Sequence, residues 1–287
     1  MSGLVSILAD GIAYGMLLFL FSIGLSITLG LMRFINLAHG AFAMCGGYVA
    51  ATLLNLYGVP FLLTLPAAAI FTALVGMAAE RSVIRHVYGM PELQQVLFSI
   101  GLAFAAGAVA NIIFGPQQQP MILPDWLTSR VDILGVEITG YRLFLMGFGL
   151  VAAGLLAALF NFTLFGARVR AAVDNRRAAE GIGINVGRLF AITFALGAGF
   201  AGLGGALAVG FLGLDPTFPL KYLVLVLMVV AIGGPGSIGG SFAAAIALGA
   251  IDAVFKYFVP QVGGFVIYGL LVLMMLFFPR GLAGRTA

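Results

Sequence analysis

Long apolar tracts dominate this sequence and limit what it can fold into. The first tract, residues 5–31, holds one charged side chain, Asp10, and eight further apolar tracts follow along the chain. Most of them approach the roughly 20 residues that an α-helix needs to cross the hydrocarbon core of a membrane. Charged residues make up only 8% of the 287 residues, whereas a soluble domain carries about a quarter. We therefore expect an all-α, polytopic membrane protein.

The chain length limits the number of crossings. At about 20 residues per span, with short connections, there is room for about eight to ten transmembrane helices and for no sizeable soluble domain. Polar and glycine-rich breaks interrupt the tracts, so we expect some helices to be broken or re-entrant. The whole chain, residues 1–287, is predicted to be a single transmembrane domain.

A polar island at residues 166–188 separates two of the tracts. Its sequence, GARVRAAVDNRRAAEGIGINVGR, is compatible with a helix. It contains five of the fourteen basic residues of the chain and two acidic ones: Arg168, Arg170, Arg176, Arg177, Arg188, Asp174 and Glu180. Because loops rich in Lys and Arg stay on the cytoplasmic side of a membrane, we interpret the island as a cytoplasmic segment on which a soluble partner acts.

Two more basic segments indicate the topology. Basic side chains gather at residues 81–86 and again at residues 280–285. All three basic segments lie on one side if the N-terminus is outside and nine segments cross the membrane. Ten spans with both ends inside remain an alternative if one segment is re-entrant. The net charge of +4 thus reflects topology and partner docking, and we expect no nucleic acid as a partner.

Residues 116–140 differ in character from the rest of the chain. Three prolines precede Trp126, and after it apolar residues alternate with polar ones around Gly135. The alternating apolar residues are Val131, Ile133, Val136 and Ile138. Such a period of two around a glycine is typical of a β-hairpin. We expect a small hairpin on the outer face, opposite the polar island.

Two breaks in the apolar tracts are candidates for a translocation pathway. Buried polar groups inside a membrane are expensive, and broken helices place backbone polar groups near the midplane in many transporters. The first break lies at residues 33–40, and the second is GGPGSIGGS at residues 233–241. The candidate residues are Asn36, His39, Gly40, Gly46, Gly234 and Pro235. For Asn36 and His39, helix capping at the membrane interface stays open as the alternative.

Two further patterns predict contacts of helices. Small residues recur at every fourth position within the tract 189–212, which lets two helices approach closely. They are Ala198, Gly202, Ala206 and Gly210. Asp252 and Lys256 are spaced i, i+4 on one predicted helix, so we expect an ion pair. The competing explanations are that small residues are common in all membrane helices, and that the charged pair snorkels to the outer interface.

The sequence lacks the spacings that enzymes and metal sites require. Neither lysine, Lys221 or Lys256, belongs to a GxxxxGK[ST] phosphate loop. His39 and His86 lie in separate loops, and Cys45 is the single cysteine. We therefore expect no catalytic residues, no metal and no cofactor. If ATP drives this protein, another subunit must bind the nucleotide.

Three blocks of the chain resemble one family. GLSITLGLMRFINLAHGAFAMCGGYVA, residues 24–50, is similar to the N-terminal signature of branched-chain amino acid ABC transporter permeases. Residues 170–210 are similar to the coupling loop and following helix of that family, and GGPGSIGGSFAAAIALG, residues 233–249, to its third block. The resemblance spans nearly the whole chain. At this length the chain resembles the LivH-type subunit more than the longer LivM-type subunit.

The resemblance implies a heteromeric importer in the bacterial inner (plasma) membrane. The implied partners are a second permease subunit of LivM type, two cytoplasmic ATP-binding subunits, a periplasmic substrate-binding protein and membrane lipid. A short helix carrying Arg170, Ala179, Glu180 and Gly181 would sit in a groove on the ATPase and pass its closure to the spans as a rigid-body motion. The hairpin, residues 120–139, would help to dock the binding protein.

The substrate and the class of transport leave alternatives. Branched-chain amino acids are the expected substrate, but the family also resembles importers of urea, short amides and aromatic acids, and no residue decides among them. A proton-coupled secondary transporter using His39 or Asp252 is a second class, and the charged island argues against it. A membrane scaffold without transport is a third, and the glycine-rich breaks argue against that one.

Overall fold

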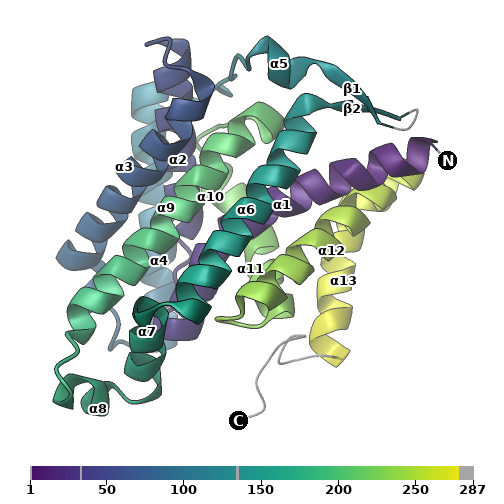
Figure 1. Cartoon of the computed structure of the whole chain (residues 1–287). Coiled ribbons are helices and arrows are strands. Elements are labelled where there is room, and N and C mark those ends of the chain that lie inside the picture. Colours follow the sequence, from purple (N-terminus) through teal and green to yellow (C-terminus); the bar gives the residue numbers. More distant parts are fainter. Residues whose placement is uncertain (1, 33, 134–135, 278–287) are drawn as a thin grey trace.

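A computed structural model gives the fold and describes residues 2–32, 34–133 and 136–277 (Figure 1). The longer helices are α1 (Ser2–Met32), α2 (His39–Asn55), α3 (Phe61–Ser82), α4 (Glu92–Phe114), α6 (Gly140–Phe162), α9 (Val186–Leu212), α12 (Ile238–Phe258) and α13 (Pro260–Phe277). The shorter ones are η1 (Ile84–His86), α5 (Asp125–Thr128), α7 (Leu164–Asp174), α8 (Arg176–Gly181), α10 (Phe218–Lys221) and α11 (Leu223–Gly233). The strands are β1 (Arg130–Ile133) and β2 (Val136–Thr139).

The expected all-α, polytopic architecture is confirmed. Six helices in the described part of the chain are long and apolar enough to cross a membrane, namely α1, α3, α4, α6, α9 and α12. The other three predicted tracts are helical as well. Of these, α2 has 17 residues, α11 has 11 and α13 has 18. The tract around α11 is divided, because α10 and α11 form two short helices there.

Burial separates the spans into an inner and an outer set. In the most apolar stretches of α1 and α9, 89% and 78% of the residues are buried, whereas this share is 17–33% in α3, α4, α6 and α12. Large apolar side chains such as Leu63, Phe104 and Leu155 are exposed on the outer helices. Surfaces of this kind face lipid or another subunit in a membrane. The core of the protein therefore lies along α1 and α9.

Small residues let α9 approach α2 and α3. A Cβ atom added to Gly205 would overlap the carbonyl oxygen of Ala43 in α2, and one added to Gly202 would overlap the side chain of Thr72 in α3. Gly46 of α2 faces the backbone of Gly202 just as closely. The close approach predicted for this face of α9 is confirmed at Gly202, and Gly205 extends it toward α2.

The second close crossing joins α1 to α12. A Cβ atom added to Gly11 would lie 2.6 Å from the Cα atom of Ala250, and one added to Gly15 would lie 2.8 Å from the carbonyl oxygen of Ala245. In the same helix, the predicted ion pair of Asp252 and Lys256 is confirmed, with 2.6 Å between Oδ2 and Nζ. Helix α12 thus closes over the central helix through its small residues.

The predicted hairpin is confirmed. Strands β1 and β2 pair antiparallel, with Val131 opposite Ile138, and the predicted turn residue Gly135 lies outside the described residues. Val136 and Ile138 are buried against Ala9 of α1, so β2 is fixed to the central helix. The short helix α5, which precedes the hairpin, was not predicted.

The hairpin and the polar island lie at opposite ends of the molecule. Figure 1 shows α5, β1 and β2 at one end of the bundle and α7 and α8 at the other. This placement agrees with the prediction that residues 116–140 and 166–188 lie on opposite faces of the membrane. The third basic segment used for the topology, residues 280–285, lies outside the described residues.

Candidate functional site

The polar island forms two short helices that follow a tight reversal after α6. Gly166 allows this reversal, because a Cβ atom there would overlap the backbone of Phe160 at the end of α6. The hydroxyl of Thr163 accepts a hydrogen bond from the amide of Gly166 at 3.3 Å and caps α7. The guanidinium of Arg170 donates to the carbonyl oxygen of Phe160. Helix α7 is therefore fixed to the end of a membrane span.

Helix α8 is short but well capped. The side chain of Asn175 accepts a hydrogen bond from the amide of Ala178 at 3.0 Å, which starts the helix. Arg176 and Glu180 form an i, i+4 ion pair of 2.9 Å on its exposed surface. Ala179 is buried, whereas a Cβ atom added to Gly181 would meet nothing within 4 Å. One face of α8 thus packs on the protein, and the other is open.

The connection from α8 to α9 is equally defined. Gly183 adopts a positive φ of 88°, which glycine accommodates without strain. Asn185 then caps α9 by accepting a hydrogen bond from the amide of Arg188 at 2.9 Å. Because α9 is one of the two core helices, α8 is tied on both sides to membrane-spanning structure.

The structure places the residues predicted for ATPase coupling together at this end of the molecule. Their side chains are exposed, apart from buried Ala179, and they are Arg168, Arg170, Asp174, Arg176, Arg177, Glu180 and Gly181. Their surface is helical and charged, as the sequence indicates. Their coupling role stays a prediction.

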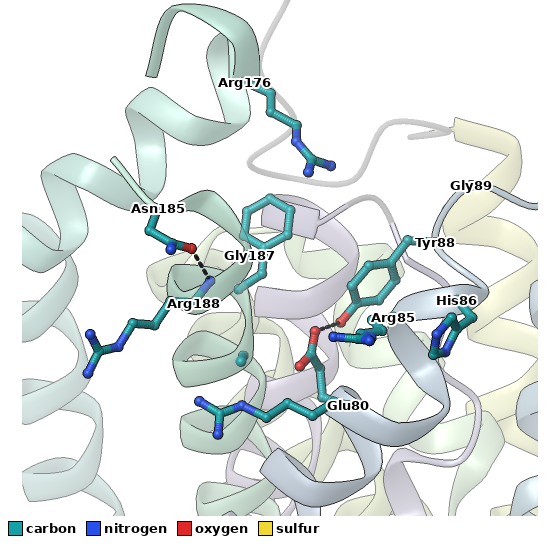
Figure 2. Close-up of a pocket in the computed structure, with 12 residues that line it drawn as sticks. Glu80, Arg85, His86, Tyr88, Gly89, Arg176, Asn185, Gly187 and Arg188 are labelled. Atoms are coloured by element: carbon teal, nitrogen blue, oxygen red, sulfur yellow. Dashed lines mark hydrogen bonds between the residues drawn. The ribbon is translucent and has the colours of Figure 1, made fainter. Parts of the chain in front are cut away.

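A basic hollow lies beside α8. It has a volume of about 740 Å³, and its wall is formed by the end of α3, the α3–α4 connection, α8 and the start of α9. The lining residues are Glu80, Arg81, Arg85, His86, Tyr88, Gly89, Arg176, Asn185, Gly187, Arg188, Phe190 and Ala191. Figure 2 shows Arg85 next to Glu80, and Arg176 reaching from α8 toward them. Two of the basic segments predicted to share one side of the membrane therefore meet here.

Of the basic residues of this hollow, Arg81, Arg85 and His86 were expected only to mark the topology, whereas Arg176 and Arg188 were expected to belong to the segment on which a soluble partner acts. The signal that could have identified the hollow is the occurrence of arginines at the end of α3, in the connection after it, and at the start of α9. The hydroxyl of Tyr88 donates to Glu80 at 3.1 Å. Burial, and after it the negative charge of Glu80, raises the pKa of the Tyr88 phenol well above its ordinary value. Tyr88 therefore remains a neutral donor, and its partner is the single carboxylate among the lining residues.

Gln95 connects the hollow to the first break and was not predicted. Its amide nitrogen donates to the carbonyl oxygen of Met90 at 2.9 Å, beside the hollow. Its amide oxygen accepts from the backbone N–H of Ile35 at 3.2 Å, in the break before α2. The side chain is buried. It therefore joins the α3–α4 connection to a proposed part of the pathway.

Asn36 and His39 are buried with incomplete hydrogen bonding. Asn36 accepts a hydrogen bond from the amide of Ala38 at 3.2 Å, a local turn that precedes α2. Among the described residues, Asn36 Nδ2 and His39 Nε2 have no hydrogen-bond partner. The imidazole lies against Gly24 of α1. Asn36 thus supports the start of the helix, as the capping alternative states, while two buried donor or acceptor atoms remain unpaired.

Of the other four pathway candidates, Gly40 and Gly46 lie at close contacts between helices. Gly40 approaches Pro219, with 2.8 Å between an added Cβ and the carbonyl oxygen, and Gly46 approaches Gly202. Gly234 has a positive φ of 85° and ends α11, directly before Pro235.

The second break is anchored on α1. The amide of Gly236 donates to the carbonyl oxygen of Ser26 at 2.9 Å, and the hydroxyls of Ser26 and Ser241 lie 2.9 Å apart. Gly30 of α1 contacts Pro235 and Gly236. The two breaks therefore meet the same helix, at Gly24 and at Gly30, roughly 9 Å apart along its axis at a rise of 1.5 Å per residue. Their role in translocation stays a prediction.

A metal centre is not suggested by the described part of the chain. Within residues 2–32, 34–133 and 136–277, no three side chains of His, Cys, Asp or Glu lie together in a way that could hold a metal ion.

Comparison with known proteins identifies the family. Residues 7–275 match the family model described as "Branched-chain amino acid transport system / permease component". The high-affinity branched-chain amino acid transport system permease protein LivH of Salmonella typhimurium is 26% identical, with 96% of this chain and 94% of LivH covered. The high-affinity branched-chain amino acid transport system permease protein BraD of Pseudomonas aeruginosa is 29% identical, with 97% of this chain and 95% of BraD covered.

A longer relative and the solved structures complete the comparison. LivM of Salmonella typhimurium is 25% identical over 94% of this chain but only 68% of its own length, which agrees with the expected resemblance to LivH rather than LivM. No solved structure matches the chain significantly. With its apolar spans, the chain is a multi-pass inner-membrane protein and one component of a multi-subunit transporter. It belongs to the family of permease components of branched-chain amino acid transport systems.

Proposed function

We propose that this chain is the transmembrane permease subunit of a binding-protein-dependent ABC importer for branched-chain amino acids. The observation that carries the proposal is the family match over residues 7–275, which includes the exposed helices α7 and α8. In this proposal residues 1–287 are one permease domain, and the chain itself hydrolyses no ATP. A second permease subunit of LivM type, two cytoplasmic ATPases and a periplasmic binding protein complete the importer.

Helix α8 is the proposed contact with an ATPase. Its open surface carries the Arg176–Glu180 pair and Gly181. The preceding helix α7 is fixed to α6 through Arg170, and the cap at Asn185 starts α9 directly after α8. A force on α8 would therefore reach an outer span and a core span together. Such attachments favour rigid-body transmission of ATPase closure.

The two breaks on α1 are the proposed pathway. An amino acid has a charged amine and a charged carboxylate, which need polar partners in the membrane. Asn36 Nδ2 and His39 Nε2 are buried polar atoms without a partner among the described residues, and Gly234 and Pro235 interrupt the helical backbone after α11. A rearrangement at α1 that exposes these groups would supply the substrate with partners.

The hairpin is proposed to contribute to docking of the periplasmic binding protein. It is anchored to α1 by Val136 and Ile138, and the ion pair of Asp10 and Arg142 joins α1 to the start of α6 beside it. A docked protein would thus act on the central helix. Deletion of residues 130–139 is expected to abolish binding-protein-dependent uptake. Intact uptake by a correctly inserted deletion variant would remove this assignment.

The function is tested by ATPase activity of the reconstituted complex with its binding protein. Stimulation by leucine, and none by urea or an aromatic acid, is the expected result. The matched control omits the binding protein, and stimulation should then disappear. Stimulation by another compound would keep the transport mechanism and replace the substrate. No stimulation by any of them, with uptake that depends on a proton gradient, would overturn the proposal in favour of a secondary transporter.

A further inference from the structure

The basic hollow beside α8 has a strong excess of positive charge. Four arginines and one glutamate line it, so its formal charge is +3 with His86 neutral. Arg176 is paired with Glu180. The other three, Arg81, Arg85 and Arg188, form no salt bridge within the described part of the chain, although Arg81 and Arg85 lie near enough to Glu80 to attract it electrostatically. A hollow with unpaired arginines is suited to an anion, and the planar guanidinium fork matches the oxygens of a phosphate group.

The hollow lies at the depth of lipid headgroups. Arg81 is the second-last residue of the span α3, and Arg188 is the third residue of the span α9. Both therefore mark the boundary between hydrocarbon and water on the side that we assign to the cytoplasm. Basic pockets between spans on this side of a membrane are suited to anionic lipid headgroups.

Exposed apolar residues lie next to the lining residues of the hollow in the chain. Phe190 and Ala191 of α9 form part of its wall. On the neighbouring elements, Val83 is 48% exposed and Leu93 is 68% exposed. A molecule with a phosphate in the hollow could lay apolar chains along this surface, whereas a small soluble anion would leave it uncovered. An acidic peptide would likewise leave this apolar surface uncovered.

We propose that the hollow binds the phosphate group of an anionic phospholipid of the inner leaflet. Arg81 and Arg85 contact the phosphate oxygens beside the hydroxyl of Tyr88, Arg188 adds positive charge from the opposite wall (Figure 2), and the acyl chains follow α3 and α4. The proposal requires only that the chain spans the membrane. It does not depend on the nature of the transported substrate or on docking of an ATPase to α8.

The test measures lipid retention by native mass spectrometry. The full-length protein in mild detergent is titrated with phosphatidylglycerol or with phosphatidylcholine, in the presence and absence of excess inorganic phosphate. The variant Arg81→Gln/Arg85→Gln/Arg188→Gln removes the three unpaired charges. The control Arg168→Gln removes one exposed arginine from the same side that does not line the hollow.

Wild type and Arg168→Gln are expected to retain phosphatidylglycerol in preference to phosphatidylcholine. The triple variant should lose this preference by roughly 100-fold, since each basic side chain near an anionic surface contributes about a factor of five. The charges of the hollow also allow a variant that binds better. Glu80→Gln raises its formal charge from +3 to +4 and should strengthen retention several-fold, which misfolding could not produce.

Three results would overturn the proposal or show that the bound phosphate belongs to a soluble ligand and not to a lipid. Equal retention by wild type and the triple variant would overturn it. Displacement of the lipid by inorganic phosphate would keep the phosphate site but assign it to a soluble ligand. Unchanged lipid retention, together with failure of the triple variant to co-purify the ATPase subunit that wild type retains, would overturn it in favour of an acidic segment of that partner.

Discussion

Replacement of Gly181 by tryptophan should separate docking from folding. Gly181 is the last residue of α8, and a Cβ atom there would meet nothing within 4 Å. The backbone φ angle of Gly181 is not positive, so another residue can adopt it without strain. A larger side chain therefore creates no clash inside the subunit. Because glycine in a helix is less favourable than alanine by about 0.5–1 kcal/mol, folding should be unaffected or slightly improved.

The same change should strongly weaken an interface that covers α8. If the ATPase packs against the open surface around Gly181, the interface has room for a glycine only, and the indole ring would overlap the ATPase. Overpacking of this kind costs about 1–3 kcal/mol, which corresponds to roughly 5–150-fold weaker association. Uptake driven by ATP should fall accordingly, while the amount of inserted protein stays the same.

Co-purification of the ATPase and uptake in proteoliposomes are the two measurements. Gly181→Ala serves as the control for the position, and it should behave as wild type. Gly154→Trp adds the same bulk to an open position in the outer helix α6, and it should keep the ATPase. Wild-type uptake and full ATPase retention by Gly181→Trp would refute the assignment of α8 as the docking helix.

Three further substitutions test the charge, the core and the ion pair. Glu180→Lys should abolish uptake while leaving insertion intact, because the exposed pair that it breaks contributes only about 0.3–0.5 kcal/mol; normal uptake would contradict this. Gly205→Val should destabilise the protein by about 3 kcal/mol or more, seen as a lower melting temperature in detergent, because its side chain overlaps the backbone of Ala43. Lys256→Met should cost about 1–3 kcal/mol by leaving Asp252 unpaired, and the double variant with Asp252→Asn should recover much of that loss.

Hydropathy predicted the positions of the helices in the sequence but not which helices are buried in the core of the protein. The spans of α1 and α4 have nearly equal mean hydropathies, 2.1 and 2.2. Yet 89% of the residues are buried in the most apolar stretch of α1 and only 17% in that of α4. In a membrane, lipid and protein interior are about equally apolar, so the polarity of a helix face carries little information. Small residues carry more, and Gly202 on the predicted face of α9 does lie at a close helix crossing.

The candidate site was predictable only where it is continuous in the sequence. Helices α7 and α8 follow from the charged island, and the hairpin follows from its alternation. The basic hollow combines the end of α3 with the start of α9, segments about 100 residues apart, and their contact depends on packing that no local pattern encodes. Gln95 was missed for the same reason, since its partner Ile35 lies 60 residues away.

The central position of α1 has a consequence for the order of assembly in the cell. It leaves the ribosome well before its partners α9 and α12, which begin at residues 186 and 238. At about 5–20 residues per second, α1 must wait roughly 10–50 seconds for them. The hydroxyls of Ser22 and Thr28 donate to backbone carbonyl oxygens of α1 itself, so they are hydrogen-bonded before α9 and α12 are made. Ser26 instead bonds with Ser241, so its hydroxyl obtains that partner only when the last third of the chain has been made.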